Sequence, residues 1–179
     1  MYKKIFAVFV FLFLAMGYVT LASAEAQEGT DGKGVPVITQ SFASKEVRPG
    51  DTWKVYLNVS DPDGNIKRIF AIVNQTGVGE YPVSIIRVKG ENNKELSGYI
   101  YLYTSAAGFS GQFVKLTLSV HVQNKSGKFS QPAVFPLFIQ GRSAQEAPPQ
   151  GVFKEQAIGP IMIQLHNIPG GVGGSAMAL

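Results

Sequence analysis

The feature that most constrains the fold of this chain is a strict alternation of apolar and polar side chains between residues 52 and 60. The apolar positions are Trp53, Val55, Leu57 and Val59, and the polar positions between them are Lys54, Tyr56, Asn58 and Ser60. Successive side chains of an extended strand point to opposite faces, so the pattern predicts a strand with one face in a core and the other in water.

A second alternating segment, residues 113–123, places Val114, Leu116, Leu118, Val120 and Val122 on one face. We expect these two segments to be the central strands. Weaker alternation predicts five further strands at 36–42, 66–74, 81–89, 95–104 and 133–140, with glycine, proline and aspartate turns between them. Seven short strands separated by turns predict an all-β fold, in which two sheets pack face to face as a sandwich.

Two longer stretches carry a family resemblance. They are residues 49–72, PGDTWKVYLNVSDPDGNIKRIFAI, and residues 111–127, GQFVKLTLSVHVQNKSG. Together they resemble exported bacterial modules of immunoglobulin-like fold, in which a strand ending in Asp-x-Asp-Gly is followed by the next strand. The single tryptophan, Trp53, lies on the second predicted strand, a placement more similar to fibronectin type III modules. The resemblance covers residues 36–141 and implies scaffolding or binding as the role.

The N-terminal segment predicts where the protein works. Lys3 and Lys4 precede an apolar run from Ile5 to Met16, and residues 22–24 are Ala-Ser-Ala, the small residues that signal peptidase requires. We expect cleavage after residue 24, a periplasmic or extracellular mature protein, and no membrane segment in that form. The alternative is an uncleaved anchor, because weakly apolar residues continue to Leu21 and only just reach the length of a bilayer span.

Removing 24 of 179 residues leaves 155, enough for one domain and a tail. The predicted layout is a signal peptide (1–24), a flexible leader (25–35), an immunoglobulin-like sandwich (36–141), a linker (142–157), an extra strand (158–168) and a flexible tail (169–179). The extra strand has two potential partners. It either pairs with an edge of its own sandwich, which the linker length favours, or docks onto another subunit through Ile158–Leu165 and forms a homo-oligomer.

Composition excludes several classes of partner. Without the two signal lysines, the 16 basic residues fall to 14 against 12 acidic ones, and the longest basic run after the leader is Lys67-Arg68. This balance leaves no basic patch for nucleic acid or for an anionic membrane surface. The chain has no cysteine, so hydrophobic burial must stabilise the exported domain without disulfides.

The only metal-like spacing is that of Asp61, Asp63 and Asn65, which matches the start of many calcium loops. The sixth and twelfth positions of an EF-hand would then be Ile66 and Ile72 instead of glycine and glutamate, so the motif is not an EF-hand. These three residues are weak calcium candidates. The favoured interpretation is a plain turn, in which aspartate side chains bond to nearby backbone.

No motif indicates catalysis or a cofactor. The two histidines, His121 and His166, are far apart in the sequence and have no other ligand type at metal-binding spacing. Residues 108–112, Gly-Phe-Ser-Gly-Gln, miss the nucleophile-elbow pattern at their last position. We therefore predict a protein that is not an enzyme and has no cofactor.

The feature that points to binding is a row of tyrosines, Tyr99, Tyr101 and Tyr103, on one predicted strand. They alternate with smaller or aliphatic residues, so their rings should line up on the outer surface, with Phe113 nearby. Aromatic rows of this kind stack on sugars or anchor a protein, because each ring offers a large contact area at little entropic cost. The alternative is that the C-terminal segment simply covers this face.

The sequence thus predicts an exported, non-catalytic binding or interaction module for a protein or carbohydrate partner. The alternative function is a structural subunit of a cell-surface or periplasmic assembly that docks through its C-terminal strand. A third hypothesis, an accessory domain of a hydrolase system, has no supporting motif in this chain.

Overall fold

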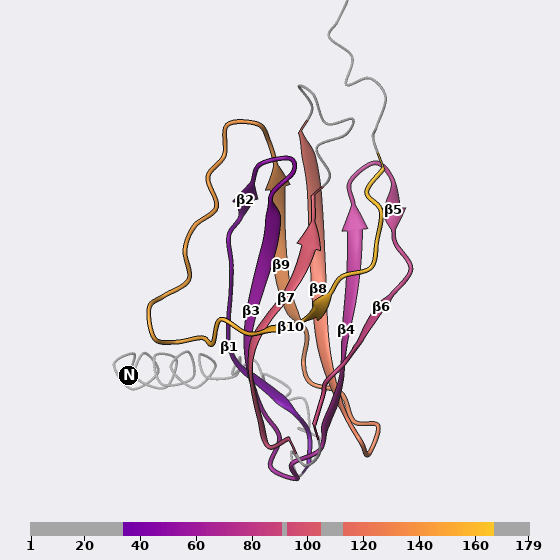
Figure 1. Cartoon of the computed structure of the whole chain (residues 1–179). Helices are drawn as coiled ribbons and strands as arrows, with labels where there is room; N and C mark the ends of the chain where they lie inside the picture. The colour runs from indigo at the N-terminus through magenta and orange to yellow at the C-terminus, as the bar shows by residue number, and fades with distance from the viewer. Residues whose placement is uncertain (1–33, 91–92, 105–112, 167–179) are drawn as a thin grey trace, which may run out of the picture. The chain divides into compact units, whose positions relative to one another are not determined.

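The computed structural model describes residues 34–90, 93–104 and 113–166, which fold into two β-sheets (Figure 1). The four-stranded sheet has the order β1 (Val37–Ala43), β3 (Thr52–Ser60), β7 (Glu95–Tyr103), β10 (Ala157–Pro160). The six-stranded sheet has the order β2 (Glu46–Val47), β9 (Ala133–Ile139), β8 (Val114–Asn124), β4 (Ile66–Gln75), β5 (Gly79–Glu80), with β6 (Ser84–Arg87) also beside β4. The predicted signal peptide, the leader up to residue 33 and the tail from residue 169 lie outside the described residues.

All seven predicted strands are present, as β1, β3, β4, β6, β7, β8 and β9. The prediction that two of them are central is confirmed, because β3 lies between β1 and β7, and β8 lies between β9 and β4. The bounds differ most for β6, which begins at Ser84 instead of residue 81. Pro82 precedes it, and proline has no amide hydrogen to donate to a strand ladder.

The strand order is that of an immunoglobulin-like sandwich. The antiparallel strands β1, β3 and β7 occupy the places of the first, second and fifth strands of such a domain, and β4, β8 and β9 form the central part of the opposite sheet. After β1 the chain crosses to the other sheet, where Val47 of β2 pairs with Ile139 of β9 in parallel. The expected extra strand is β10, which lies parallel to β7 at the sheet edge that the fourth strand occupies in constant-type domains.

The core lies between the two sheets and is built from the residues that the alternation places inward. Both central strands contribute buried side chains at every second position: Trp53, Val55, Leu57, Val59, Val114, Leu116, Leu118, Val120 and Val122. The Trp53 indole is fully buried, and its Nε1 donates a hydrogen bond of 2.8 Å to the carbonyl oxygen of Ser44. This bond ties β3 to the point where the chain leaves the first sheet.

One expectation for β3 is wrong. Tyr56 lies on the outer face of the sheet, where the alternation predicts contact with water, yet only 4% of its surface is exposed. The reason is a segment far along the chain that crosses this face, and that segment builds the site described next.

Candidate functional site

Residues 142–156, which we call the strap, leave the end of β9 and return across the outer face of the four-stranded sheet to β10 (Figure 1). A linker was predicted here, but the strap makes specific contacts with the sheet. The register of β1 with β3 ends at the pair Ala43–Val55, so from Thr52 to Lys54 the β3 edge that faces β1 has no strand beside it, while the other edge stays paired with β7. The side chain of Gln145 takes that place: its Oε1 accepts from the Lys54 amide at 3.2 Å and its Nε2 donates to the Thr52 carbonyl at 3.1 Å.

Farther along the strap, Glu155 holds two side chains of β3 at once. The Tyr56 hydroxyl donates to Glu155 Oε1 at 2.6 Å, and Lys54 Nζ lies 3.0 Å from Glu155 Oε2. The ring of Phe153 packs on Tyr56 with centroids 5.6 Å apart, and Lys54 Nζ lies 4.5 Å from the centre of the Tyr99 ring. The strap is therefore held by a charged contact and an aromatic contact side by side.

This arrangement shifts the titration of all three polar groups. The hydrogen bonds from Tyr56 and Lys54 lower the pKa of Glu155 below its ordinary value. Burial, together with the hydrogen bond to Glu155, raises the pKa of Tyr56 to about 12. The hydrogen bond to Glu155 also raises the pKa of Lys54. The contact is thus fully formed only while Glu155 is ionised and Tyr56 and Lys54 are protonated.

We predict that the strap loosens in acid. Because the folded pKa of Glu155 lies below its unfolded value, the stabilisation is present above pH 4.5 and is lost as the pH falls through the folded pKa. Because the folded pKa of Tyr56 lies above its unfolded value, the same contact holds below pH 10.0 and is lost as the pH rises through about 12. Limited proteolysis of residues 142–156 across the acid range measures this. In the variant Glu155→Gln the rate of cleavage should be independent of pH across this range. If the variant instead showed the same dependence on pH as the wild type, the assignment to Glu155 would be wrong.

After the strap, the chain turns around the edge of β7 into the opening between the two sheets. The Tyr99 amide donates to the Gln156 carbonyl at 2.9 Å, and the Ile161 amide donates to the Tyr101 carbonyl at 2.7 Å. Gly98 permits the turn, because a Cβ at that position would overlap the Gln156 carbonyl oxygen. The side chain of Ile161 is buried in the core, so the C-terminal segment completes the sandwich of its own chain.

The far end of this segment is fixed by polar contacts with the six-stranded sheet. Gln75 Nε2 donates to the His166 carbonyl at 2.7 Å, and Gln75 Oε1 accepts from the Tyr81 hydroxyl. The His166 amide donates to the same hydroxyl at 2.8 Å, and the two rings stack with centroids 5.6 Å apart. Of the two arrangements considered for the extra strand, the structure shows the one within its own sandwich.

The tyrosine row of β7 lies on the outer face, as predicted, but the strap divides it. Consecutive rings are 6.2 Å and 5.4 Å apart along the row Tyr99, Tyr101, Tyr103. Tyr99 packs against Tyr56 and under Lys54, whereas Tyr103 is 67% exposed. Tyr99 and Tyr101 are thus both half-buried, and Tyr103 is the exposed member of the row.

Phe113 does not join this row. It directly precedes β8 and lines a hollow on the six-stranded sheet together with Lys115 and Phe138. The expectation that it would be near the tyrosines is wrong, because consecutive strands β7 and β8 belong to different sheets.

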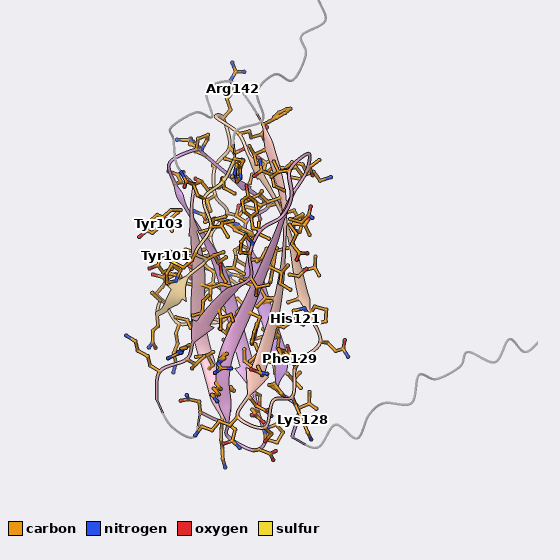
Figure 2. The ribbon with its side chains drawn as sticks, turned by 90° about the vertical axis from the view of Figure 1, so that its right-hand side faces the viewer. Tyr101, Tyr103, His121, Lys128, Phe129 and Arg142 are labelled. Atoms are coloured by element: carbon orange, nitrogen blue, oxygen red, sulfur yellow. The ribbon has the colours of Figure 1, made fainter. Side chains whose placement is uncertain are left out.

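Tyr101 and Tyr103 form one wall of an open groove of about 390 Å³, which we call the aromatic groove. Its other wall is the chain after β10, residues 160–164, where Met162 is 76% exposed. In Figure 2 the two tyrosines project from one side of the molecule, away from His121 and Phe129. The lining of the groove is mostly apolar.

The calcium candidates form a self-contained turn. Asp61 is buried, and its two carboxylate oxygens accept hydrogen bonds from the amides of Asp63 and Asn65, each at 3.2 Å. Asn65 Nδ2 donates in turn to the Asp63 carbonyl at 2.9 Å. Within the described ranges, no three histidine, cysteine or acidic side chains are grouped so that they could hold a metal ion. The same ranges contain no helix long and apolar enough to cross a membrane.

Sequence reasoning missed the strap residues Gln145, Phe153 and Glu155. Each acts as a single side chain in a proline-containing segment, so no periodic pattern marks them. The one available signal is that an aromatic residue and an acid occur close together just before the predicted extra strand.

Comparison with known proteins gives little that bears on this site. No protein-family model matches the chain, and no curated protein matches it. Among solved structures, the chain is similar to the CARDB domain of the PF1109 protein of Pyrococcus furiosus, whose structure was solved in complex with di-metal ions. The sequence identity is 11%, the TM-score is 0.28, and the alignment covers 59% of this chain and 86% of that one. A superposition this loose does not carry the metal site of that protein over to this chain.

Proposed function

We propose that this protein is an exported, non-catalytic interaction module that binds a protein partner through the aromatic groove. The observation that carries the proposal is the pair of highly exposed side chains, Tyr103 and Met162, on either side of that groove.

Export to the periplasm or beyond the cell is supported by the lysines, apolar run and Ala-Ser-Ala of the first 24 residues. The placement of Trp53 on β3 supports a subtype similar to fibronectin type III modules.

The composition of the groove favours a protein over other ligands. Tyrosine offers a large, rigid contact area with a polar tip, and it is enriched among residues that dominate binding energy. Methionine adapts its shape to irregular partner surfaces. Neighbouring exposed apolar side chains are a feature of many contact surfaces, so their position on either side of one groove supports the proposal.

The test is a cross-linking experiment with paired variants. A photoreactive group at position 103 should capture a defined partner in the envelope or medium of the producing cell. The double variant Tyr101→Ser, Tyr103→Ser should weaken binding of that partner by roughly 30-fold, the effect of losing one interface hot spot. The matched control is Phe138→Ser, because Phe138 is an exposed aromatic on the six-stranded sheet. Equal binding by a folded double variant would remove the groove as the contact surface.

The same experiment distinguishes the second candidate function, a subunit of a homo-oligomeric assembly. The observation that favours it is that β10 is short and pairs with β7 through only three residue pairs, so two copies could exchange it at little cost. Cross-links that join two copies of this chain would favour assembly through Ile158–Leu165. Cross-links to a different protein would favour the binding module.

A further inference from the structure

A second hollow on the four-stranded sheet points to a ligand of a different kind. It has a volume of about 570 Å³ and lies between the sheet and residues 151–154 of the strap, on the opposite side of Tyr56 from the aromatic groove. Six polar side chains surround it: Thr39, Asn58, Ser60, Glu95, Ser97 and Lys154. We call it the polar cavity.

The side chain of Asn58 carries an acceptor that its surroundings do not satisfy. Its Nδ2 donates to Gln40 Oε1 and to the Val152 carbonyl, both at 2.9 Å. A carbonyl can only accept, so the Val152 contact fixes which amide atom is nitrogen. Asn58 Oδ1 is then buried, and no group in the described residues donates to it. Among the described residues it is the one buried side-chain nitrogen or oxygen without a hydrogen-bond partner, and leaving such an atom unsatisfied is costly.

The neighbouring side chains offer both kinds of hydrogen-bonding group. Ser97 Oγ accepts from the Lys154 amide at 3.1 Å, which leaves its own hydroxyl hydrogen to donate. Glu95 provides a carboxylate acceptor and Lys154 an ammonium donor, and neither is in a salt bridge within the described part of the chain. The Phe153 ring, which rests on Tyr56, gives the cavity an apolar wall.

We propose that the polar cavity binds one sugar unit of a neutral carbohydrate. A sugar hydroxyl donates and accepts at the same time, so a ring of hydroxyls matches a cavity lined by both donors and acceptors, and its C–H face suits an aromatic wall. The single carboxylate and single ammonium cancel in charge, which disfavours phosphate and other anions. This inference does not depend on the aromatic groove or on its protein partner.

The test is an NMR titration of the ¹⁵N-labelled protein with glucose, galactose, mannose and N-acetylglucosamine, followed by maltotriose and chitotriose. We expect at least one sugar to shift the signals of the Asn58 side-chain amide and the Ser97 and Lys154 backbone amides in a saturable way. Single sugars bind weakly in open sites, so the dissociation constant should be on the order of 1 mM. Tighter binding of a trisaccharide than of its monomer would identify a glycan chain as the source, and equal binding would identify the free sugar.

Two variants and one control locate the site. Glu95→Gln should weaken binding by about 10-fold, and Ser97→Ala by about 5-fold. Glu95 is exposed, so its replacement leaves the fold intact. The control Glu80→Gln changes another exposed acid, on β5 of the other sheet, and should bind like the wild type. Absence of saturable shifts with every sugar would overturn the proposal, as would shifts that survive both variants or centre on Tyr101 and Tyr103. Binding of a protein partner at the aromatic groove is measured by the cross-linking experiment at position 103, so the two proposals can fail independently.

Discussion

Replacing Trp53 with alanine should lower the free energy of unfolding by about 3–5 kcal/mol, the range for removing a large aromatic side chain from a core. The indole is fully buried between the sheets, and it also satisfies the Ser44 carbonyl where the chain leaves the first sheet. A typical domain has only about 5–15 kcal/mol of stability, so the variant should be partly unfolded at moderate urea concentrations. Circular dichroism during urea denaturation measures the loss, because the chain has no other tryptophan for fluorescence.

The variant Trp53→Phe separates the two contributions of this side chain. It retains an aromatic ring in the core but leaves the Ser44 carbonyl without its donor, so we expect a loss of about 1–3 kcal/mol. A midpoint for Trp53→Ala close to that of the wild type would show that the residue does not lie at the centre of the core.

Replacing Gly98 with valine should either strain or displace the point where the strap joins β10. The new Cβ would overlap the Gln156 carbonyl, a backbone atom that cannot rotate away, and would also press on Ile158. If the segment stays in place, the crowding should cost about 1–3 kcal/mol of folding free energy. If it moves, the amides of Tyr99 and Ile161 lose their acceptors.

Hydrogen exchange distinguishes these outcomes, because both amides should exchange faster in Gly98→Val only when the segment is displaced. The matched control is Gly141→Ala, since Gly141 lies just before the strap and a Cβ there would meet no atom within 4 Å. Wild-type stability together with wild-type exchange in Gly98→Val would contradict the close approach at this position.

The sandwich could be predicted from the sequence because burial on one face of a strand acts at every second residue. In the C-terminal segment, the alternation predicts correctly which side chains are buried but not how far the strand extends. Ile161, Ile163 and Leu165 alternate as predicted and pack against the core. The backbone there does not continue the ladder, because β10 ends at Pro160 and the Met162 amide instead bonds to Ser84 Oγ at 2.9 Å. Side-chain alternation reports burial, and it reports strand pairing only where a neighbouring strand is available.

The site was less predictable than the fold. The outer position of Tyr99, Tyr101 and Tyr103 follows from alternation, but their accessibility depends on a strap that begins about forty residues later in the sequence. Contacts such as Gln145 with the edge of β3 join single side chains to backbone groups and leave no pattern in the sequence. Local periodicity contains no information about which surface a distant, irregular segment will cover.

The position of β10 in the chain has a consequence for biosynthesis. A ribosome makes the chain from its N-terminus, so β10 emerges after every other strand, although its partner β7 is complete more than fifty residues earlier. During that interval the edge of β7 is open, and an open strand edge is a template for aggregation. A chain that stops short of residue 157 would leave that edge of β7 without its partner strand.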